Sequence, residues 1–325
     1  MAKAIRIHQT GGPDVFVVED VAVGDPGPGQ ARIRQTACGV NFLDTYHRSG
    51  QYPLRHPLPC ILGGEAAGVV VAIGDGVRAV KPGDRVVYSG QPGAYCDERL
   101  VRANRLFPIP DGVSDIEAAA IFNKGMTAEY LIRRAYPVTA GETILVHAAA
   151  GAVGLVLCQW GRHLGATVLG TVSTEAKAEI ARENGCDHPI FYTRENFAER
   201  ARALTDGAGV SVVFDSVGKD TFERSMDALR RRGYLVCFGE SSGPAPVIDP
   251  RILMYKGSIF LTRASLIDYV VTDDEFNDAA RSLFALVKSG AIKIHVNQTY
   301  RLADVAQAHR DLEARKTTGS SVLLP

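Results

Sequence analysis

One feature near the middle of the chain limits the fold more than any other: an apolar strand runs into a glycine-containing turn and then a helix. The strand pattern covers residues 143–147, the turn reads Ala-Ala-Ala-Gly-Ala-Val-Gly over residues 148–154, and the helical pattern covers residues 155–164. Small residues let such a turn approach a pyrophosphate within hydrogen-bond distance, and the helix N-terminus adds free N–H groups and partial positive charge. The segment therefore predicts a dinucleotide-binding turn, with Ala149 and Ala152 where the pattern often has glycine.

The flanking sequence repeats this alternation between about residues 123 and 262. Strand patterns lie at residues 143–146, 167–172, 210–215, 233–238 and 258–262, and helical patterns at 153–164, 175–184, 197–204 and 222–229. Repeated strand–helix units predict an α/β fold in which parallel strands form a Rossmann-type, doubly wound sheet.

The sequence before residue 123 has a different character, because short β-branched runs alternate with Gly/Pro turns. Such runs occur at residues 31–35, 67–73 and 85–88. This spacing is typical of an antiparallel or barrel-like β domain.

The chain after residue 262 adds two helical and two strand patterns, at residues 273–289, 302–313, 293–300 and 320–324. We assign them to the first domain, because the series of strand–helix units is already complete. Residues 1–122 and 263–325 would then form one domain and residues 123–262 the other. One domain inserted into another predicts a cleft between them, where ligands often bind.

The composition argues against several classes of function. Lys+Arg and Asp+Glu both number 36 in 325 residues, so a net charge of zero gives no general attraction to nucleic acid or anionic membranes. The most apolar stretch, residues 143–158, is too short to span a bilayer, and the first residues lack the apolar run of a secretion signal. Six scattered cysteines without a Cys-x-x-Cys pair favour reduced thiols and a cytoplasmic protein.

The residues after the next predicted strand indicate which coenzyme the turn binds. An NAD-preferring site has Asp or Glu about 20 residues beyond the turn, where the carboxylate accepts a hydrogen bond from the ribose 2′-hydroxyl. Here the strand ends at Val172 and is followed by Ser173 and Thr174, with Glu175 close by and Lys177 one turn into the helix. Hydroxyls and an ammonium suit a 2′-phosphate, so the sequence favours NADPH.

Two segments of the first domain resemble the medium-chain dehydrogenase/reductase superfamily, which includes the zinc alcohol dehydrogenases. They are Cys38-Gly-Val-Asn41 and Gly63-Gly-Glu-Ala-Ala-Gly68. Cys38 is a zinc ligand in the zinc members, but Gly64 here replaces the histidine ligand and Asn123 stands where a further cysteine is expected. One thiolate cannot supply the three protein ligands of a catalytic zinc, so we expect no metal.

Across its length, the sequence resembles the quinone oxidoreductase (zeta-crystallin-like) branch of this superfamily. The matching segments are residues 41–46, 48–50, 64–68, 83–87, 124–127, 147–154, 158–160, 215–218, 238–239, 241–243, 256–258, 262–263 and 318–325. The resemblance implies a zinc-independent NADPH:quinone oxidoreductase, with a Rossmann-type domain and a GroES-like, mainly β-barrel catalytic domain. It also implies a homodimer joined through the Rossmann domains.

The resemblance further implies roles for individual residues. Those bordering the nicotinamide, its ribose or the diphosphate would be Asn41, Phe42, Tyr46, Thr127 and Tyr130, and those at the pyrophosphate Gly151, Ala152, Val153 and Gly154. Those around the 2′-phosphate would be Ser173, Thr174, Lys177, Tyr192 and Arg315, and those along the ribose and carboxamide end Val217, Phe238, Gly239, Ser241, Ser242, Ala264, Ser265 and Leu266.

A quinone accepts electrons readily, so no metal is needed to polarise it, and the coenzyme supplies the difficult chemistry. The protein must stack the quinone against the nicotinamide and exclude water. The reduced oxygen needs a hydrogen-bond or proton donor, for which Asn41, Tyr46 and Tyr52 are candidates, while Thr127 could orient the nicotinamide.

Two alternatives remain open. The same coenzyme could reduce the carbon–carbon double bond of an enone or alkenal, or the chain could be a nucleotide-binding protein with a structural or RNA-binding role. Zero net charge and the lack of a basic stripe with interleaved aromatics argue against RNA. We interpret the one short basic run, Arg230-Arg-Arg232, as a solvated helix end, where cations suit the helix dipole.

Overall fold

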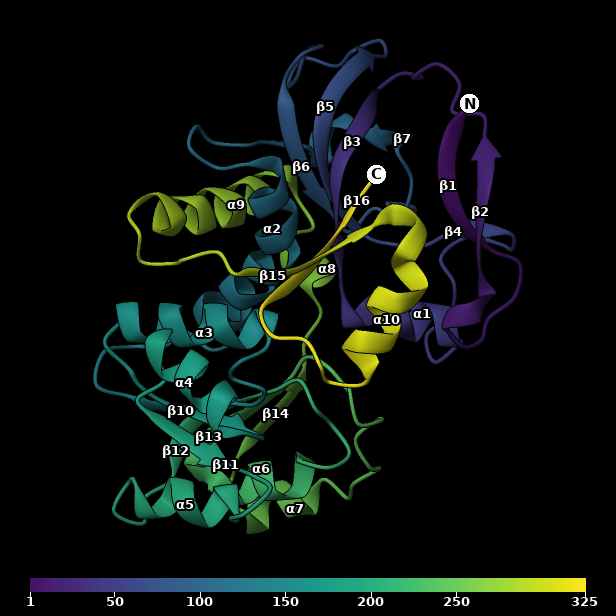
Figure 1. The fold of residues 1–325 in the computed structure, drawn as a ribbon. Helices are drawn as coiled ribbons and strands as arrows, with labels where there is room; N and C mark the ends of the chain where they lie inside the picture. The colour runs from purple at the N-terminus through teal and green to yellow at the C-terminus, as the bar shows by residue number, and fades with distance from the viewer. The chain divides into compact units, whose positions relative to one another are not determined.

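The structure is a computed structural model that describes residues 1–325, and it divides into two compact units (Figure 1). Unit 1 comprises Met1–Lys124, Thr272–Phe284 and Ile294–Pro325, and unit 2 comprises Gly125–Val271 and Ala285–Lys293.

We expected the inserted domain to end at residue 262. Unit 2 instead extends to Val271 and also includes residues 285–293. The backbone N–H of Ala264 donates to the carbonyl of Cys237 at 3.0 Å. Lys293 exchanges two hydrogen bonds with the side chain of Gln159, of 2.7 and 3.3 Å.

Unit 2 contains a parallel sheet of six strands in the order β11-β10-β9-β12-β13-β14. The strands are β9 (Thr143–Val146), β10 (Thr167–Val172), β11 (His188–Phe191), β12 (Val210–Asp215), β13 (Leu229–Cys237) and β14 (Phe260–Arg263). The strand order changes side at β9: β10 and β11 lie on one side of it, and β12, β13 and β14 lie on the other. Ligands of doubly wound sheets bind at such a switch point, beyond the carboxyl ends of the strands.

Helices alternate with these strands. They are α3 (Ala152–His163), α4 (Glu175–Glu183), α5 (Phe197–Ala203), α6 (Phe222–Ala228), α7 (Arg251–Tyr255) and α8 (Leu266–Tyr269). Helix α3 buries an apolar face that includes Trp160, the one tryptophan of the chain. Phe197 of α5 and Met226 of α6 join a buried cluster with Leu145 and Val213 of the central strands.

Unit 1 contains two sheets. A small one has the order β2-β1-β4, and a larger one has the order β15-β16-β3-β5-β6-β8, with β7 also paired to β3. The strands are β1 (Ala2–Ile7), β2 (Phe16–Val21), β3 (Gln30–Val40), β4 (Cys60–Ile61), β5 (Glu65–Ile73), β6 (Arg85–Ser89), β7 (Glu98–Arg102), β8 (Phe107–Pro108), β15 (Val296–Arg301) and β16 (Ser320–Leu324). All pairs are antiparallel except β15–β16.

Helices α1 (Phe42–Ser49) and α10 (Val305–Glu313) belong to unit 1, while α2 (Asp115–Tyr130) and α9 (Asp273–Lys288) each contain a unit boundary. A π-helical turn, η3 (Leu131–Ala135), follows α2, and short 3-10 turns lie at η1 (Pro13–Val15), η2 (Ala103–Arg105) and η4 (Leu302–Asp304). None of the helices combines the length and the apolarity that crossing a bilayer requires.

Strand β3 positions the predicted site residues of α1, because it runs directly into that helix. Its penultimate residue is Gly39, where a side-chain Cβ would overlap the Glu65 carboxylate and the Ala119 carbonyl. Glycine at this position therefore makes room for a charged side chain inside the sheet.

The expectation that Arg230-Arg-Arg232 ends a helix was wrong. Helix α6 ends at Ala228, and the arginines lie within β13. Val210 pairs with Leu229 and Val212 with Tyr234, so the arginines and Gly233 bulge out opposite a single residue of β12. A bulge tolerates charged residues because their side chains leave the buried ladder.

Candidate functional site

Most of the predicted coenzyme residues of unit 2 follow the carboxyl end of a strand. Ser173 follows β10, Tyr192 follows β11, Phe238 follows β13 and Ala264 follows β14, while Val217 lies two residues beyond β12. The strands are parallel, so their carboxyl ends lie along one edge of the sheet. The fold therefore gathers these residues at one edge, although they span about 90 positions of sequence.

The predicted pyrophosphate turn has the local geometry that an anion needs. Gly151 precedes α3 and no side chain caps this helix, so the first-turn N–H groups of Ala152 and Val153 remain open to a ligand. Ala148 has a left-handed φ of 52°, which turns the chain sharply after β9. A Cβ on Gly154 would overlap the Ala148 carbonyl oxygen, so only glycine lets the helix come this close. These residues fit the pyrophosphate of a dinucleotide.

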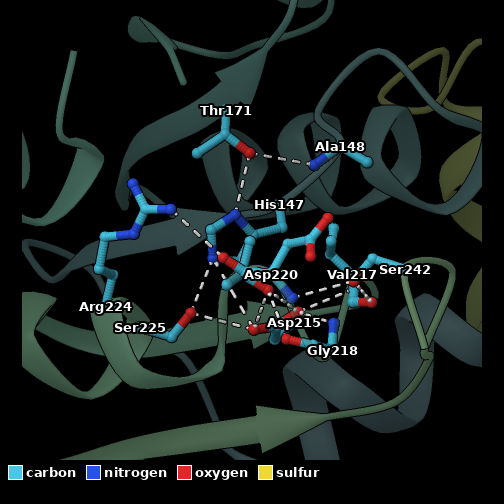
Figure 2. Close-up of polar contacts among 11 residues, drawn as sticks. His147, Ala148, Thr171, Asp215, Val217, Gly218, Asp220, Arg224, Ser225 and Ser242 are labelled. Atoms are coloured by element: carbon cyan, nitrogen blue, oxygen red, sulfur yellow. Dashed lines mark hydrogen bonds and ion pairs between the residues drawn. The ribbon is translucent and has the colours of Figure 1, made fainter. Parts of the chain in front are cut away.

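A buried network behind this turn ties the loop after β9 to β10 and α6 (Figure 2). His147 Nδ1 lies 2.9 Å from Thr171 Oγ1, and the same hydroxyl oxygen accepts from the backbone N–H of Ala148 at 3.3 Å. His147 Nε2 lies 2.9 Å from Ser225 Oγ. Burial lowers the pKa of His147, so the imidazole is neutral at neutral pH.

The network continues to Asp215, which organises the loop after β12 (Figure 2). Its carboxylate accepts from the backbone N–H groups of Val217 and Gly218 at 2.8 and 3.0 Å, and from Ser225 Oγ at 3.0 Å. Ser225 thus donates to the aspartate and is not activated by the histidine, and Asp215 and Ser225 are fully buried. The Ser, His and Asp here position loops; they are not a hydrolase triad.

The loop after β10 carries the residues predicted for the 2′-phosphate. Thr174 caps α4, its hydroxyl accepting from the backbone N–H of Lys177 at 3.3 Å. Tyr192 is 39% exposed and its N–H donates to the Val172 carbonyl at 3.3 Å, which brings it beside the end of β10. Arg315 belongs to unit 1, where it follows α10 with a left-handed φ of 57°.

Two other predicted residues lie on α2 in unit 2. Thr127 is half-buried. Tyr130 is buried, its ring stacks on Tyr269 with centroids 4.8 Å apart, and its hydroxyl donates to the Ala264 carbonyl at 3.4 Å. Burial raises the pKa of Tyr130, so its phenol keeps its proton at neutral pH. Ser241 N–H donates to the carbonyl of Ser216, and Ser242 Oγ to that of Val217.

In unit 1, the candidate acceptor residues form an aromatic group at α1. The Tyr46 and Tyr52 rings have centroids 5.1 Å apart, and Phe42 lies 6.3 Å from Tyr46. The backbone N–H of Tyr52 donates to the Tyr46 carbonyl at 3.0 Å, which returns the loop after α1 to the helix. Asn41 starts the helix, so these four predicted residues come together.

The positions that hold zinc in the metal-dependent relatives carry other chemistry here. The Cys38 thiol is buried, donates to the Ala94 carbonyl at 3.0 Å, and has its pKa raised by burial, so it stays protonated. Gly64 offers no side chain, and Asn123 Nδ2 donates to Asn41 Oδ1 at 3.2 Å. No group of three or more His, Cys, Asp or Glu side chains in residues 1–325 is arranged to hold a metal ion.

Beside these positions lies an ion pair that the sequence analysis missed. Lys124 Nζ donates to Glu65 Oε2 at 2.5 Å, and Glu65 is fully buried. The same carboxylate accepts from Asn41 Nδ2 at 3.0 Å and from the backbone N–H of Asn123 at 2.5 Å. The sequence held one signal for this pair. Glu65 follows Gly64 and Lys124 follows Asn123, so one acid and one base each lie next to a replaced zinc ligand in an otherwise apolar segment.

A second buried network lies behind α1. Tyr95 Oη donates to Asp44 Oδ2 at 2.8 Å and lies 3.1 Å from His309 Nε2. Arg48 Nη1 donates to His309 Nδ1 at 3.0 Å and Nη2 pairs with Glu313 at 2.7 Å. Asp44 Oδ2 also accepts from the Asn41 backbone N–H at 2.9 Å, so this network holds the start of the helix.

A pocket of about 820 Å³ in unit 2 lies elsewhere, at the amino ends of β12 and β13. Arg202, Asp227, Arg231 and Tyr255 are among its lining residues, and none of the predicted coenzyme residues lines it. Helices α5, α6 and α7 all end here, and cations suit helix C-termini. Arg202 accordingly donates to three backbone carbonyls.

Comparison with known proteins extends these observations. The family described as "Alcohol dehydrogenase GroES-like domain" matches residues 27–140, and the family described as "Zinc-binding dehydrogenase" matches residues 184–323. A quinone oxidoreductase of Pseudomonas aeruginosa is 47% identical, with 100% of both chains covered. A 2-haloacrylate reductase of a Burkholderia species is also 47% identical, with 100% of this chain and 99% of the relative covered.

The solved structure of Escherichia coli quinone oxidoreductase complexed with NADPH is 45% identical and covers 100% of both chains with a TM-score of 0.97. The predicted fold class, a Rossmann-type sheet domain with a GroES-like domain, is confirmed. The chain belongs to the quinone oxidoreductase family of the medium-chain dehydrogenase/reductase superfamily.

Proposed function

We propose that the chain is a zinc-independent NADPH:quinone oxidoreductase. The observation that carries this proposal is the pairing of an uncapped, glycine-packed α3 with a β10 end that is followed by the hydroxyls of Ser173 and Thr174 and by Lys177, while the nearest carboxylate, Glu175, is paired with Arg182. The full-length likeness to quinone oxidoreductases, one of them crystallised with NADPH, supports it.

NADPH would be held at the strand ends of unit 2. The first-turn N–H groups of Ala152 and Val153 would bind the pyrophosphate, and Ser173, Thr174 and Lys177 would surround the 2′-phosphate. Tyr192 and Arg315 would add to the adenosine end; Val217, Phe238, Gly239, Ser241, Ser242, Ala264, Ser265 and Leu266 would line the ribose and carboxamide end. When bound, the coenzyme supplies the reducing equivalents.

Around the acceptor, the chain's own side chains bind, orient and exclude water. The Phe42, Tyr46 and Tyr52 rings would provide an apolar face for a flat quinone, and Thr127 and Tyr130 would orient the nicotinamide ribose. Asn41 and the tyrosine hydroxyls would donate hydrogen bonds to the quinone oxygen, which gains negative charge as it is reduced.

A second candidate is reduction of a carbon–carbon double bond conjugated to a carbonyl or carboxylate. The 2-haloacrylate reductase at 47% identity favours this candidate. Negative charge again develops on an oxygen of the acceptor, so the same donors at α1 would serve both reactions.

Oxidation of NADPH by quinones of graded size, by enones and by 2-haloacrylates tests the proposal, each assayed with and without a chelator. We expect the highest kcat/KM with a quinone and no effect of the chelator. Faster turnover of the double-bond substrates would favour the second candidate. Failure of every acceptor, or loss of activity with the chelator, would contradict the proposed function.

We also propose that two copies join through unit 2 and that the protein is cytoplasmic. Strand β14 is at the edge of its sheet, with Phe260 49% and the nearby Tyr255 74% exposed, and an open apolar edge favours pairing with a second strand. All six cysteines are free and buried, which suits a reducing compartment. Light scattering should give twice the chain mass, and Phe260→Glu should give monomers; a monomeric wild-type protein would contradict the dimer.

A further inference from the structure

We propose that the buried Glu65–Lys124 ion pair fixes the side-chain amide of Asn41 so that an N–H group, and not the amide oxygen, is presented to the electron acceptor. What that N–H contacts rests on the proposed function. The orientation of the amide itself follows from residues of unit 1 alone.

The orientation is decided by Glu65, because an ionised carboxylate can only accept hydrogen bonds. Asn41 Nδ2 lies 3.0 Å from Glu65 Oε2, which already accepts from Lys124 Nζ at 2.5 Å. The reverse orientation would set the amide oxygen against the carboxylate, two acceptors with no proton between them. Chemistry thus assigns the NH₂ group to the side facing Glu65.

The other side of the Asn41 amide is also engaged. Asn123 Nδ2 donates to Asn41 Oδ1 at 3.2 Å, so the amide oxygen already has a donor. In the capping box of α1, the Asn41 side chain also accepts from the backbone N–H of Asp44, so both lone pairs of its oxygen are engaged. Asn41 is only half-buried, and its second Nδ2 hydrogen is the polar group left for a ligand. Asn41 therefore acts as a donor.

Lys124 keeps this arrangement because its ammonium is the counter-charge that pairs with the Glu65 carboxylate. Glu65 is completely buried and the Lys124 side chain is 3% exposed, so neither charge is stabilised by water. Without the ammonium, Glu65 would be a buried charge without its partner, and breaking a buried pair in this way is strongly unfavourable. The carboxylate and the Asn41 amide that it holds would then rearrange.

The neighbouring elements contribute few other charges. From α1, Asp44 accepts from the Asn41 backbone N–H, and burial raises the pKa of this aspartate to about 6. From β3, the buried Cys38 thiol is protonated, and Gly39 leaves the space that the Glu65 carboxylate fills. Comparison of each variant with the wild type at the same pH removes the contribution of Asp44.

The N–H orientation has a chemical purpose in reduction. As the quinone takes up a hydride from NADPH, its carbonyl oxygen becomes an anion, which then takes a proton from solvent. A fixed N–H donor stabilises that anion, whereas an amide oxygen would repel it. Glu65 and Lys124 are thus positioning residues, and Asn41 is the residue that would touch the acceptor.

The kinetic test compares Lys124→Met and Glu65→Gln with Asp115→Asn, an acid-to-amide control that bonds Thr36 and Arg85 and not Asn41. Removing one preorganised donor lowers kcat roughly 10²–10³-fold, and we expect the Lys124→Met loss to approach this with KM nearly unchanged. A Lys124→Met enzyme with the wild-type kcat would overturn the proposal.

A spectroscopic test separates this inference from the proposed function. The side-chain amide ¹H–¹⁵N signals of Asn41, identified by their absence in Asn41→Asp, should shift in Lys124→Met and stay unchanged in Asp115→Asn. Unshifted signals in Lys124→Met would refute the orientation, whatever the enzyme reduces. Wild type inactive with every acceptor, but with the expected shift, would refute only the proposed function. If Lys124→Met does not fold, the uncharged double variant Lys124→Met/Glu65→Gln replaces it in both tests. We expect the same shift of the amide signals and the same loss of kcat. The absence of both would again refute the proposal.

Discussion

Two buried groups, Asp44 of α1 and His309 of α10, should have opposite effects on how the stability of the protein depends on pH, so that each hides the other. Burial, reinforced by Arg48, lowers the pKa of His309 from 6.5 to about 3. Burial raises the pKa of Asp44 from 3.8 to about 6, although its hydrogen bond from Tyr95 opposes the rise. Arg48 donates to His309 Nδ1 at 3.0 Å, so a proton there would face a guanidinium.

The signs follow from proton binding in the folded and unfolded states. Folded His309 stays neutral below pH 6.5 while the unfolded chain takes up a proton, so its contribution to stability falls as the pH falls. Asp44 binds a proton below about pH 6 in the folded protein, but only below its ordinary pKa of 3.8 in the unfolded chain. Its contribution to stability therefore rises as the pH falls. Between about pH 4 and 6, each state therefore holds one proton over the pair, and the two effects cancel.

Single substitutions should separate the two effects. One proton bound differently changes the free energy of unfolding by about 1.36 kcal/mol per pH unit. From pH 6 to pH 4, His309→Asn should therefore gain about 2.7 kcal/mol relative to the wild type, and Asp44→Asn should lose a similar amount. The diagnostic quantity is the change with pH, because both substitutions also remove hydrogen bonds at every pH.

Urea unfolding at pH 4, 5 and 6, followed by circular dichroism, measures these slopes. Hydrogen exchange of β3 and β5 peptides assigns the transition to unit 1. Tyr300→Phe is the control, because Tyr300 bonds Asp311 outside the network and should leave the slope unchanged. Slopes of the same sign in the two variants, or slopes equal to the wild type, would refute the reasoning.

Three further predictions concern unit 2. Gly154→Val should push against the Ala148 carbonyl and lower the affinity for NADPH at least ~10-fold, as measured by fluorescence titration. The control Gly12→Ala, whose added Cβ meets no atom within 4 Å, should leave the affinity unchanged. Unchanged affinity in Gly154→Val would contradict the turn assignment. Lys177→Ala should weaken NADPH by about 1 kcal/mol, several-fold in Kd, and leave NADH unaffected; equal changes for both coenzymes would reject a 2′-phosphate role. Ser225→Ala removes the hydroxyl between the buried histidine and aspartate and should lower the unfolding free energy by about 1–3 kcal/mol, measured by urea titration; a cost near zero would show that water replaces it.

The central sheet could be predicted from the sequence because its strands are short apolar runs ended by turns. The patterns at 143–146, 167–172 and 210–215 coincide with β9, β10 and β12. The start of β13 was not predicted, because three consecutive arginines do not resemble a strand and only the register with β12 reveals the bulge. Helix α2 was also missed, since residues buried on several sides leave no apolar stripe.

The candidate site also has a part that the sequence predicts and a part that it does not. The pyrophosphate turn is local, so its glycines and the following helix are legible in a dozen residues. The Glu65–Lys124 pair joins residues 59 positions apart, and Arg48 meets His309 across 261 positions. Such pairs depend on how β5, α1, α2 and α10 pack, and no spacing rule connects them. Sequence reasoning therefore located the residues next to the lost zinc ligands but not their partners.

The placement of Trp160 makes α3 a natural optical probe. The indole is buried on the helix whose first turn would meet the pyrophosphate, and eight residues of helix correspond to about 12 Å along the axis. Indole emission overlaps the absorption of reduced nicotinamide but not of its oxidised form. Energy transfer from this single donor should therefore report both occupancy and redox state of the coenzyme, without any label attached to the chain.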